Sequence, residues 1–383
     1  KDALRLCPYA VEAVEPLLNL GVNVDEVHAL LGTSAEMSWI REYSAAKALR
    51  VQQQDAEALK AFTGLTERYK TNPHVLTNKA LCEMAASRTS EAAHTFAQVR
   101  ASDEHWLTGM DAYASILKSK NAHAELNKLT HELLSVDPHR PEGWVAAALF
   151  WDLNGARDKA VESVTKALQL DDRHLEGHIH RGQLLVEVSP DEALVCFRRA
   201  RSLSKDVRAF QGLVQAYMAR ERYKEAIGAA KELLTLRPRC PHSFALMGVA
   251  LSQLPVGLDK ARQAFDKALV LNPRSASTVL SYAQVLEARE RHKDAVDCLQ
   301  RFLAIDSDVR VHTALADALV HDKDYTEALR HYHLALSIDP SLEAAKLGVD
   351  RVDKLLKGID PDEEEDDEAL EGAQDDSFDD FHR

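Results

Sequence analysis

Histidines are the residues whose spacing comes nearest to that of a metal site. His174, His178 and His180 form one group, and His331 and His333 form another. Two histidines four residues apart, such as His174 and His178, share a helix face, but a metal site needs a third ligand, and none stands at a recognisable spacing. Side chains two residues apart point about 200° apart on a helix. We therefore expect no bound metal and histidines that are solvated or face a groove.

Nucleophilic and phosphate-binding motifs are also missing from the sequence. The five cysteines are dispersed, with no C-x-x-C pair, which is typical of reduced thiols in the cytosol or nucleus. Cys82, Cys196 and Cys298 fall inside apolar helical patterns, where burial raises the pKa of a thiol and lowers its reactivity. There is no G-x-x-x-x-G-K-[ST], G-x-G-x-x-G or G-x-S-x-G. We expect no enzyme activity, no nucleophilic cysteine and no cofactor.

The charge of the chain is concentrated at one end. The net charge is −14, and residues 358–383 contain thirteen Asp and Glu against one Arg. The other residues hold 46 basic and 48 acidic side chains, a balance of −2. Basic residues form no stripe, so we expect no nucleic-acid binding. No apolar run reaches 18 residues, so we expect no membrane-spanning helix.

A repeated phrase organises the rest of the chain. It is clearest in YTEALRHYHLALSIDP at 325–340 and returns at 259–273 and 224–238. Aligned on their last residues, nine copies end between Pro73 and Pro340 at intervals of 31 to 35 residues. A period near 34 with alanines, an aromatic or aliphatic residue and a closing proline is typical of tetratricopeptide repeats. Ala328 and Ala335 are then expected at close, buried helix contacts.

These repeats predict an all-α fold, a right-handed α-solenoid of antiparallel helix pairs. The short polar turns between paired helices force each pair antiparallel. We divide the chain into a truncated or diverged repeat at 1–41, about nine repeats at 42–341, a capping helix at 342–357 and a disordered acidic tail at 358–383. The tail suits a solvating role, contact with a basic partner or mimicry of nucleic acid. Its SFDDF end, with the lone Ser377, suits a short docking motif or a phosphorylation site.

Partner binding is the use that such an array most often serves. The first helix of each repeat lines a concave face, and its second, fifth, sixth and ninth places point into that face. In the last repeats these places predict a set of partner-binding residues: Arg208, Gln211, Gln215, His242, Leu280, Gln284, Arg310, Thr313 and Asp317.

Particular stretches resemble one family of repeat proteins, the subunit 7 family of the anaphase-promoting complex (cyclosome). They are HWLTGMDAYASIL at 105–117, RPEGWVAAALF at 140–150, the irregular turn in 254–273 and the last repeat at 311–340. The resemblance covers residues 1 to 341. It implies a non-catalytic scaffold subunit of a ubiquitin ligase that drives cell-cycle transitions, in the nucleus and cytoplasm. It also implies contacts with related tetratricopeptide subunits and a homodimer formed through an N-terminal half that this chain mostly lacks.

A second class of interaction protein is an adaptor, either a chaperone clamp for acidic C-terminal peptides or a glycosyltransferase-type module. The chaperone clamp needs Lys and Asn in one repeat, Asn in the next, and then Lys and Arg. Asn78 fits one of these places, but Thr108 and Ala112 stand where Lys and Arg are needed. The sequence therefore favours the scaffold over the clamp.

Overall fold

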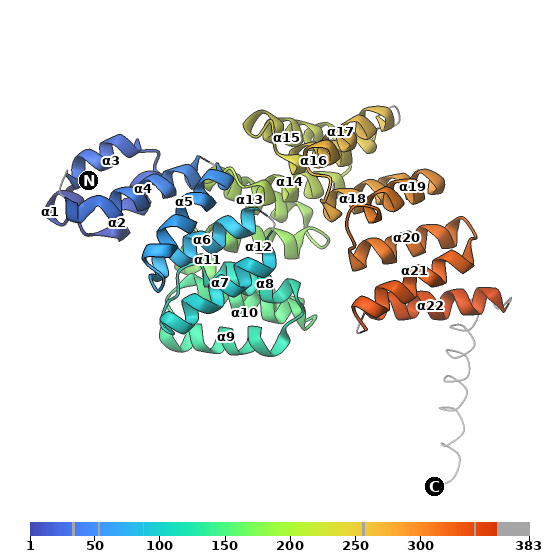
Figure 1. Cartoon of the computed structure of the whole chain (residues 1–383), viewed down its shortest axis with the longest axis horizontal. Helices are drawn as coiled ribbons and strands as arrows, with labels where there is room; N and C mark the ends of the chain where they lie inside the picture. Colours follow the sequence, from blue (N-terminus) through green and yellow to red (C-terminus); the bar gives the residue numbers. More distant parts are fainter. Residues whose placement is uncertain (33–34, 53, 87, 255–256, 341, 358–383) are drawn as a thin grey trace, which may run out of the picture. The chain divides into compact units, whose positions relative to one another are not determined.

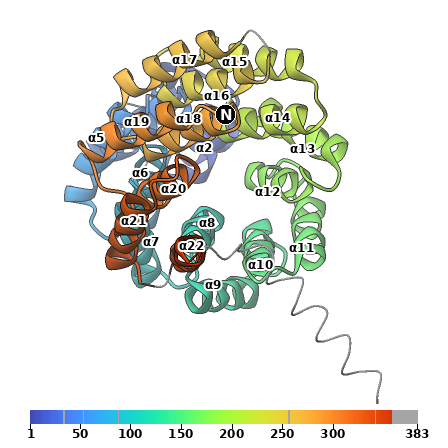
Figure 2. The ribbon, with the colours of Figure 1, turned by 90° about the vertical axis from the view of Figure 1, so that its right-hand side faces the viewer.

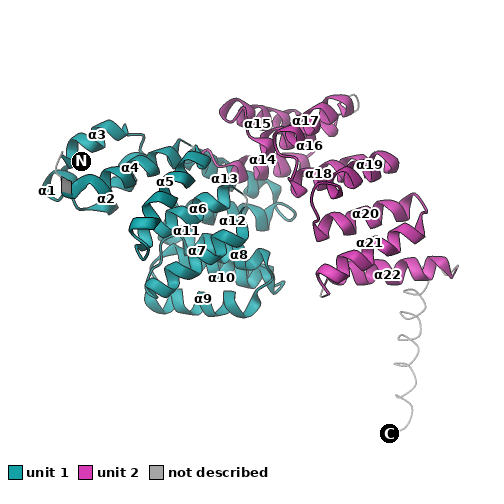
Figure 3. Ribbon diagram, viewed as in Figure 1, with its two compact units in different colours: residues 1–204 teal, residues 205–383 magenta. Residues whose placement is uncertain are grey.

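A computed structural model describes residues 1–32, 35–52, 54–86, 88–254, 257–340 and 342–357. Within these ranges all regular secondary structure is helical and no strand occurs. The chain divides into two compact units, residues 1–204 and 205–383 (Figure 3). The division falls inside the stretch that the repeat pattern predicts to be one array, and each unit is described by itself. The predicted acidic tail at 358–383 lies outside the described residues. No described helix is both long enough and apolar enough to cross a membrane.

Unit 1 contains thirteen α-helices and one short 3₁₀ turn, Ala35–Met37, among its described residues (Figure 1). The helices are α1 (Asp2–Leu6), α2 (Val11–Asn19), α3 (Val24–Leu31), α4 (Ser38–Val51), α5 (Asp55–Arg68), α6 (Pro73–Ala85), α7 (Thr89–Ser102), α8 (Met110–Ser119), α9 (His123–Val136), α10 (Pro141–Leu153), α11 (Arg157–Leu170), α12 (Leu175–Leu185) and α13 (Pro190–Leu203).

Unit 2 contains nine α-helices in the part of it that the structure describes. They are α14 (Val207–Ala219), α15 (Tyr223–Leu236), α16 (Pro241–Ser252), α17 (Leu258–Leu271), α18 (Ala276–Glu287), α19 (His292–Leu303), α20 (Val309–His321), α21 (Tyr325–Ile338) and α22 (Glu343–Leu356). The predicted fold class, an all-α array of helix pairs, is confirmed.

Within each unit the two helices of a repeat occupy different sides of a curve. Figure 2 shows α8, α10 and α12 on the inner side in unit 1, with α9 and α11 outside them. In unit 2, α16, α18 and α20 are inner and α17, α19 and α21 are outer. The inner helices are the first helices of their repeats, and the residues predicted to bind partners lie on first helices of unit 2.

The turn inside a repeat has a recurrent left-handed residue. Positive φ angles of 53° to 73° occur at the equivalent positions Asn121, Gly155, Glu221, Glu290 and Lys323. At each of them the next backbone N–H bonds to a carbonyl five residues back, as in the 2.8 Å bond from Arg222 N to Tyr217 O. This geometry satisfies carbonyls at the end of the first helix and reverses the chain, but it costs energy for residues with a Cβ.

Aromatic side chains of the second helices fill the centre of each pair. Phe197 and Phe265 are fully buried, and each ring occupies the space beside a glycine of the first helix. A Cβ added to Gly182 would lie 2.6 Å from the Phe197 ring, and one added to Gly248 would lie 2.7 Å from Phe265. The missing side chain therefore lets the ring and the first helix approach closely.

The irregular turn between α16 and α17 also depends on a glycine. A Cβ on Gly257 would lie 2.0 Å from the carbonyl oxygen of Leu251, which no side chain tolerates. Five residues, 253–257, separate α16 from α17, against three or four in the other repeats of unit 2, in line with the 35-residue interval in the repeat pattern.

The C-terminal end of the described chain is covered by α22, which packs on α20 and α21. Ala345 and Val352 are fully buried there, whereas Leu356 is 52% exposed. Ala328 and Ala335 of α21 are both fully buried, as the repeat register predicts. Small side chains at these two places let neighbouring helices approach closely.

Candidate protein-interaction surface

The predicted partner-binding residues lie on α14, α16, α18 and α20, or on their first turns, as the repeat register requires. Gln211, Gln215 and Gln284 are exposed, whereas His242 and Leu280 are half-buried. A surface of amides beside a half-buried leucine suits a polar partner segment that also brings one apolar anchor. Their role in binding stays a prediction.

Two predicted arginines are held by the same local motif, Asp-Val-Arg at the start of a helix. Asp206 and Asp308 cap α14 and α20, and each accepts a hydrogen bond from the backbone N–H of the arginine two residues on, at 2.8 and 2.9 Å. The guanidinium of Arg208 returns to Asp206 at 2.8 Å, and that of Arg310 returns to Asp308 at 3.0 Å. Burial would raise the pKa values of both carboxyls, but the arginines hold them below their usual range. Each guanidinium is thereby held beside the start of its own helix.

The last two predicted residues are engaged within the fold. Asp317 is exposed and accepts a hydrogen bond from the Tyr332 hydroxyl, which links α20 to α21. Thr313 donates to the carbonyl of Val309 at 3.0 Å, one turn back along α20. A structural role therefore accompanies any partner contact at Asp317, and a substitution there would disturb helix packing as well.

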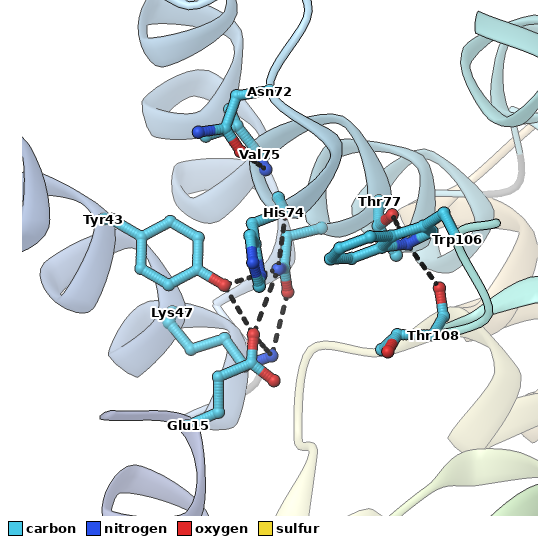
Figure 4. A network of polar contacts seen from close by, with 10 residues as sticks. Glu15, Tyr43, Lys47, Asn72, His74, Val75, Thr77, Trp106 and Thr108 are labelled. Atoms are coloured by element: carbon cyan, nitrogen blue, oxygen red, sulfur yellow. Dashed lines mark hydrogen bonds and ion pairs between the residues drawn. The ribbon is translucent and has the colours of Figure 1, made fainter. Parts of the chain in front are cut away.

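A buried polar network in unit 1 was not anticipated from the sequence (Figure 4). Lys47 of α4 lies 3.0 Å from the Glu15 carboxylate of α2 and donates to Asn78 Oδ1 of α6 at 2.9 Å. Tyr43 donates to Glu15 at 2.5 Å, and Asn78 Nδ2 donates to the Tyr43 oxygen at 2.9 Å. Lys47 and Asn78 are each only 3% exposed. The network therefore ties three successive inner helices together.

Charge within this network is balanced. Burial would raise the pKa of Glu15, but Lys47 and the hydrogen bonds of Tyr43 and Lys47 lower it to about 2. Burial lowers the pKa of Lys47 to about 8, against the attraction of Glu15. Both groups are therefore mainly ionised at neutral pH. Because the charges satisfy each other, the network is a structural element and leaves little for a ligand to bind.

Other polar contacts join separate segments of unit 1. In Figure 4 the Trp106 indole N–H donates to Thr77 at 3.0 Å and to the Thr108 carbonyl at 2.9 Å. Farther along, His174 lies 3.2 Å from the Asp111 carboxylate. Burial would lower the pKa of His174, but Asp111 raises it. Asp111 and His174 thus form a second buried charged pair, which joins parts of unit 1 that are far apart in the sequence.

The clustered histidines serve separate contacts. The His178 ring nitrogen bonds to the Asp172 carbonyl at 2.8 Å, and His180 contacts Ser115 at 3.1 Å. His331, from the second group, contacts His312 through their Nδ1 atoms at 3.1 Å. Among the described residues no three His, Cys, Asp or Glu side chains gather as a metal site would require.

The cysteines differ from the sequence-based expectation at one position. Burial raises the pKa of Cys196, and it raises that of Cys82 and of Cys298 to about 11, as the apolar patterns predict. Cys240 departs from this behaviour, because its pKa is lowered. Burial would raise its pKa, but hydrogen bonds from His242 and Ser243 lower it to about 7. The sequence R-P-R-C-P-H-S, with its cysteine among basic residues at a helix start, could have indicated a lowered thiol pKa.

Unit 2 also contains an apolar cleft of about 540 Å³. It lies between the outer helices α17 and α19, over the inner helix α18. Its lining includes Val279, Tyr282, Leu286 and Phe302. The repeat pattern predicts partner binding on the inner face and gives no sign of this outer cleft, because the cleft depends on how far apart the second helices stand.

Comparison with known proteins agrees with the geometry. A tetratricopeptide repeat family model matches residues 257–309. Anaphase-promoting complex subunit 7 of Arabidopsis thaliana is 36% identical over 375 residues, which cover 94% of this chain and 67% of the relative. The chain belongs to the anaphase-promoting complex subunit 7 family.

Subunit 7 of Dictyostelium discoideum is 30% identical over 385 residues, covering 96% of this chain and 66% of the relative. The chain thus spans about two thirds of the length of these subunit 7 relatives. One chain in a crystal structure of the Cut9–Hcn1 hetero-tetramer of the anaphase-promoting complex has a TM-score of 0.65 and 19% identity, covering 92% of this chain and 71% of that chain. At that identity it shows the fold, and the subunit 7 relationship rests on the sequence matches.

Proposed function

We propose that this chain acts as a non-catalytic scaffold subunit of the anaphase-promoting complex, positioning partner subunits for cell-cycle-regulated ubiquitination. The observation that carries the proposal is membership of the subunit 7 family over nearly the whole chain. The structure is consistent with a repeat scaffold in which buried charged groups such as Lys47 and His174 pair with Glu15 and Asp111 inside the fold. We propose that the chain works in the nucleus and cytoplasm, where that complex would act.

The partners that this proposal implies are other tetratricopeptide subunits of the same complex. We place their contact on the inner face of unit 2, where Arg208 and Arg310 are held by their capping aspartates. A guanidinium already fixed in one position loses less side-chain entropy when a carboxylate of a partner joins it. Leu280, half-buried between such polar groups, would supply an apolar anchor.

Co-purification tests the proposal. The chain is expressed in cells with an affinity tag, and its partners are identified by mass spectrometry. Co-purification of anaphase-promoting complex subunits supports the scaffold role; capture of heat-shock chaperones or of neither class contradicts it. The double variant Leu280→Glu, Arg310→Glu should weaken co-assembly without lowering helical content in circular dichroism. Arg330→Glu on the outer helix α21 is the matched charge control and should assemble normally.

The alternative, an adaptor that clamps acidic peptides in the manner of a chaperone partner, loses support in the structure. Asn78, the residue that fits the clamp pattern, is 3% exposed and bonded to Lys47 and Tyr43. A peptide could reach its amide only by breaking that network. A glycosyltransferase-type adaptor would show a different set of co-purifying proteins in the same experiment.

A direct test of catalytic activity completes the proposal. Purified chain, ubiquitin, activating enzyme and conjugating enzyme are incubated, and thioester formation is followed on non-reducing gels. We expect no ubiquitin thioester on any of the five cysteines. Cys240 is the critical one, because its lowered pKa leaves more thiolate at neutral pH than buried Cys82 and Cys298 have. A thioester on Cys240 that disappears in Cys240→Ser would replace the scaffold proposal with a catalytic one.

A further inference from the structure

The apolar cleft between α17 and α19 has exposed aliphatic side chains at its border and a floor of largely buried aromatic and aliphatic residues. Tyr282, Leu286 and Phe302 form part of its floor. Near one end, Val270 is 81% exposed and Ile305 is 53% exposed, although both belong to its lining. Large aliphatic side chains gathered around one concavity are a common mark of a binding site. Aromatic rings are well suited to such a floor, because they bury a large area with few rotatable bonds.

Charged side chains border the same cleft and influence which ligands can bind in it. Arg262 and Asp266 lie on α17, 4.0 Å apart, and Arg291 pairs with Asp294 at 2.6 Å. These are exposed pairs between near neighbours in sequence, so each is weak and open to competition from another carboxylate. Arg301 of α19 lies on the border as well. Asp297 lies on the lining too, so three arginines and three aspartates border the cleft. An occupant that combines aromatic rings with carboxylates would match the floor, and its carboxylates would exchange with Asp266 and Asp294 for Arg262 and Arg291.

The chain itself contains such a segment. Residues 375–381, DDSFDDF, carry two phenylalanines three residues apart and four aspartates. Residues 205–357 hold 23 basic and 20 acidic side chains, a balance of +3, whereas 358–383 carry −12. We propose that residues 375–381 dock in the α17–α19 cleft of the same chain, with Phe378 and Phe381 on its apolar floor. This docking goes beyond the proposed function and does not depend on it.

The tether is long enough for this contact. Residues 358–374 are seventeen residues, which span at most about 60 Å when fully extended. The last helix, α22, packs on α20, and α20 packs on α18 and α19. With helix axes 8–10 Å apart, the cleft lies roughly 30 Å from α22. A tether of this kind raises the local concentration of the segment to the order of millimolar, so weak contacts suffice for docking.

Photo-crosslinking in the full chain tests the docking. Phe378 is replaced by p-benzoylphenylalanine, the chain is irradiated, and crosslinked residues are mapped by mass spectrometry. We expect crosslinks in monomers that concentrate on α17, α18 and α19. Salt at about 0.5 M should lower their yield, because it shortens the range of charge interactions to a few ångströms. The same photo-residue at Leu370 is the control and should give few crosslinks to the cleft.

Two further variants make the result decisive. Arg301→Glu on the cleft border should lower the crosslink yield about threefold or more, whereas Arg330→Glu on α21 should leave it unchanged. Phe381→Ala should also lower it, and this variant cannot unfold the cleft because it changes only the segment. Crosslinks spread over both units would overturn the proposal. So would crosslinked dimers whose yield rises with concentration, since these would identify a second copy as the source of the segment.

Discussion

Lys47 and Glu15 form a 3.0 Å ion pair between α4 and α2 in which the Lys47 side chain is 4% exposed. The same ammonium donates to Asn78 of α6, so one buried lysine joins three inner helices. An ion pair at this depth is costly to desolvate, so its net contribution to stability is small. It favours one arrangement of the three helices, because a different placement leaves a buried charge unpaired. Inner-helix packing at the N-terminal end of unit 1 is therefore set by polar contacts as well as by apolar burial.

Replacing Lys47 with Ala should destabilise the protein by about 3 kcal/mol, because Glu15 and Asn78 would remain buried without their partner. Urea unfolding followed by circular dichroism measures the loss. Lys60→Ala on the exposed side of α5 is the control and should change stability by less than about 0.5 kcal/mol. Equal effects of the two substitutions would show that the network contributes nothing specific.

Acid should weaken unit 1 through Glu15. The folded protein lowers the pKa of this carboxyl from 4.5 to about 2, so its contribution is present above pH 4.5 and is lost as the pH falls from 4.5 toward 2. For this partly exposed side chain we expect about 2 kcal/mol over that interval. Glu15→Gln should flatten the stability profile between these pH values. An unchanged slope in the variant would mean that other carboxyls account for acid unfolding.

The left-handed turn residues predict stabilising substitutions. Glu290 has a φ of 58°, a conformation that glycine adopts without steric cost, and the equivalent residue at 155 is already glycine. Glu290→Gly should therefore raise stability by about 0.5–1 kcal/mol. Glu225→Gly, inside α15, should lower it by about 1 kcal/mol instead. Differential scanning calorimetry distinguishes the two, and a destabilised Glu290→Gly variant would contradict the turn geometry.

Ala335 lies fully buried on α21, where a longer side chain has no room. Ala335→Glu should cost about 3 kcal/mol or more, because the new carboxylate would be buried without a partner. Ala344→Glu, on the exposed side of α22, is the matched control and should be close to neutral. Thermal melts that show no loss for Ala335→Glu would disprove the repeat register.

Cys240 should react with iodoacetamide over a lower pH range than an ordinary thiol. Its pKa of about 7 leaves roughly half of it as thiolate at neutral pH, whereas buried Cys82, with a pKa of about 11, stays protonated. Peptide mass spectrometry of samples alkylated from pH 6 to pH 9 gives the profile of each cysteine. His242→Ala should move the Cys240 midpoint upward. A wild-type midpoint above about 8.5 would show that His242 and Ser243 do not act on the thiol.

The repeat and the local structure of each helix pair follow from the amino-acid pattern. A spacing of 31 to 35 residues, with alanines at positions such as 328 and 335, specified helix pairs and identified the side chains that become buried. The same periodicity identified which helices are inner and which residues they carry. These features depend on contacts within one repeat or between neighbouring repeats, and such contacts recur with the sequence period.

Tertiary structure alone decided the features that depend on residues far apart in the chain. Glu15 and Asn78 are 63 residues apart, and nothing in either local pattern shows that both reach Lys47. The opening of the α17–α19 cleft is set by the spacing of whole helices, since a small difference in packing decides whether a groove closes. The lowered pKa of Cys240 needs His242 and Ser243 oriented on the thiol, and composition cannot supply that orientation. Interactions that depend on distance and direction are determined only when the helices have packed.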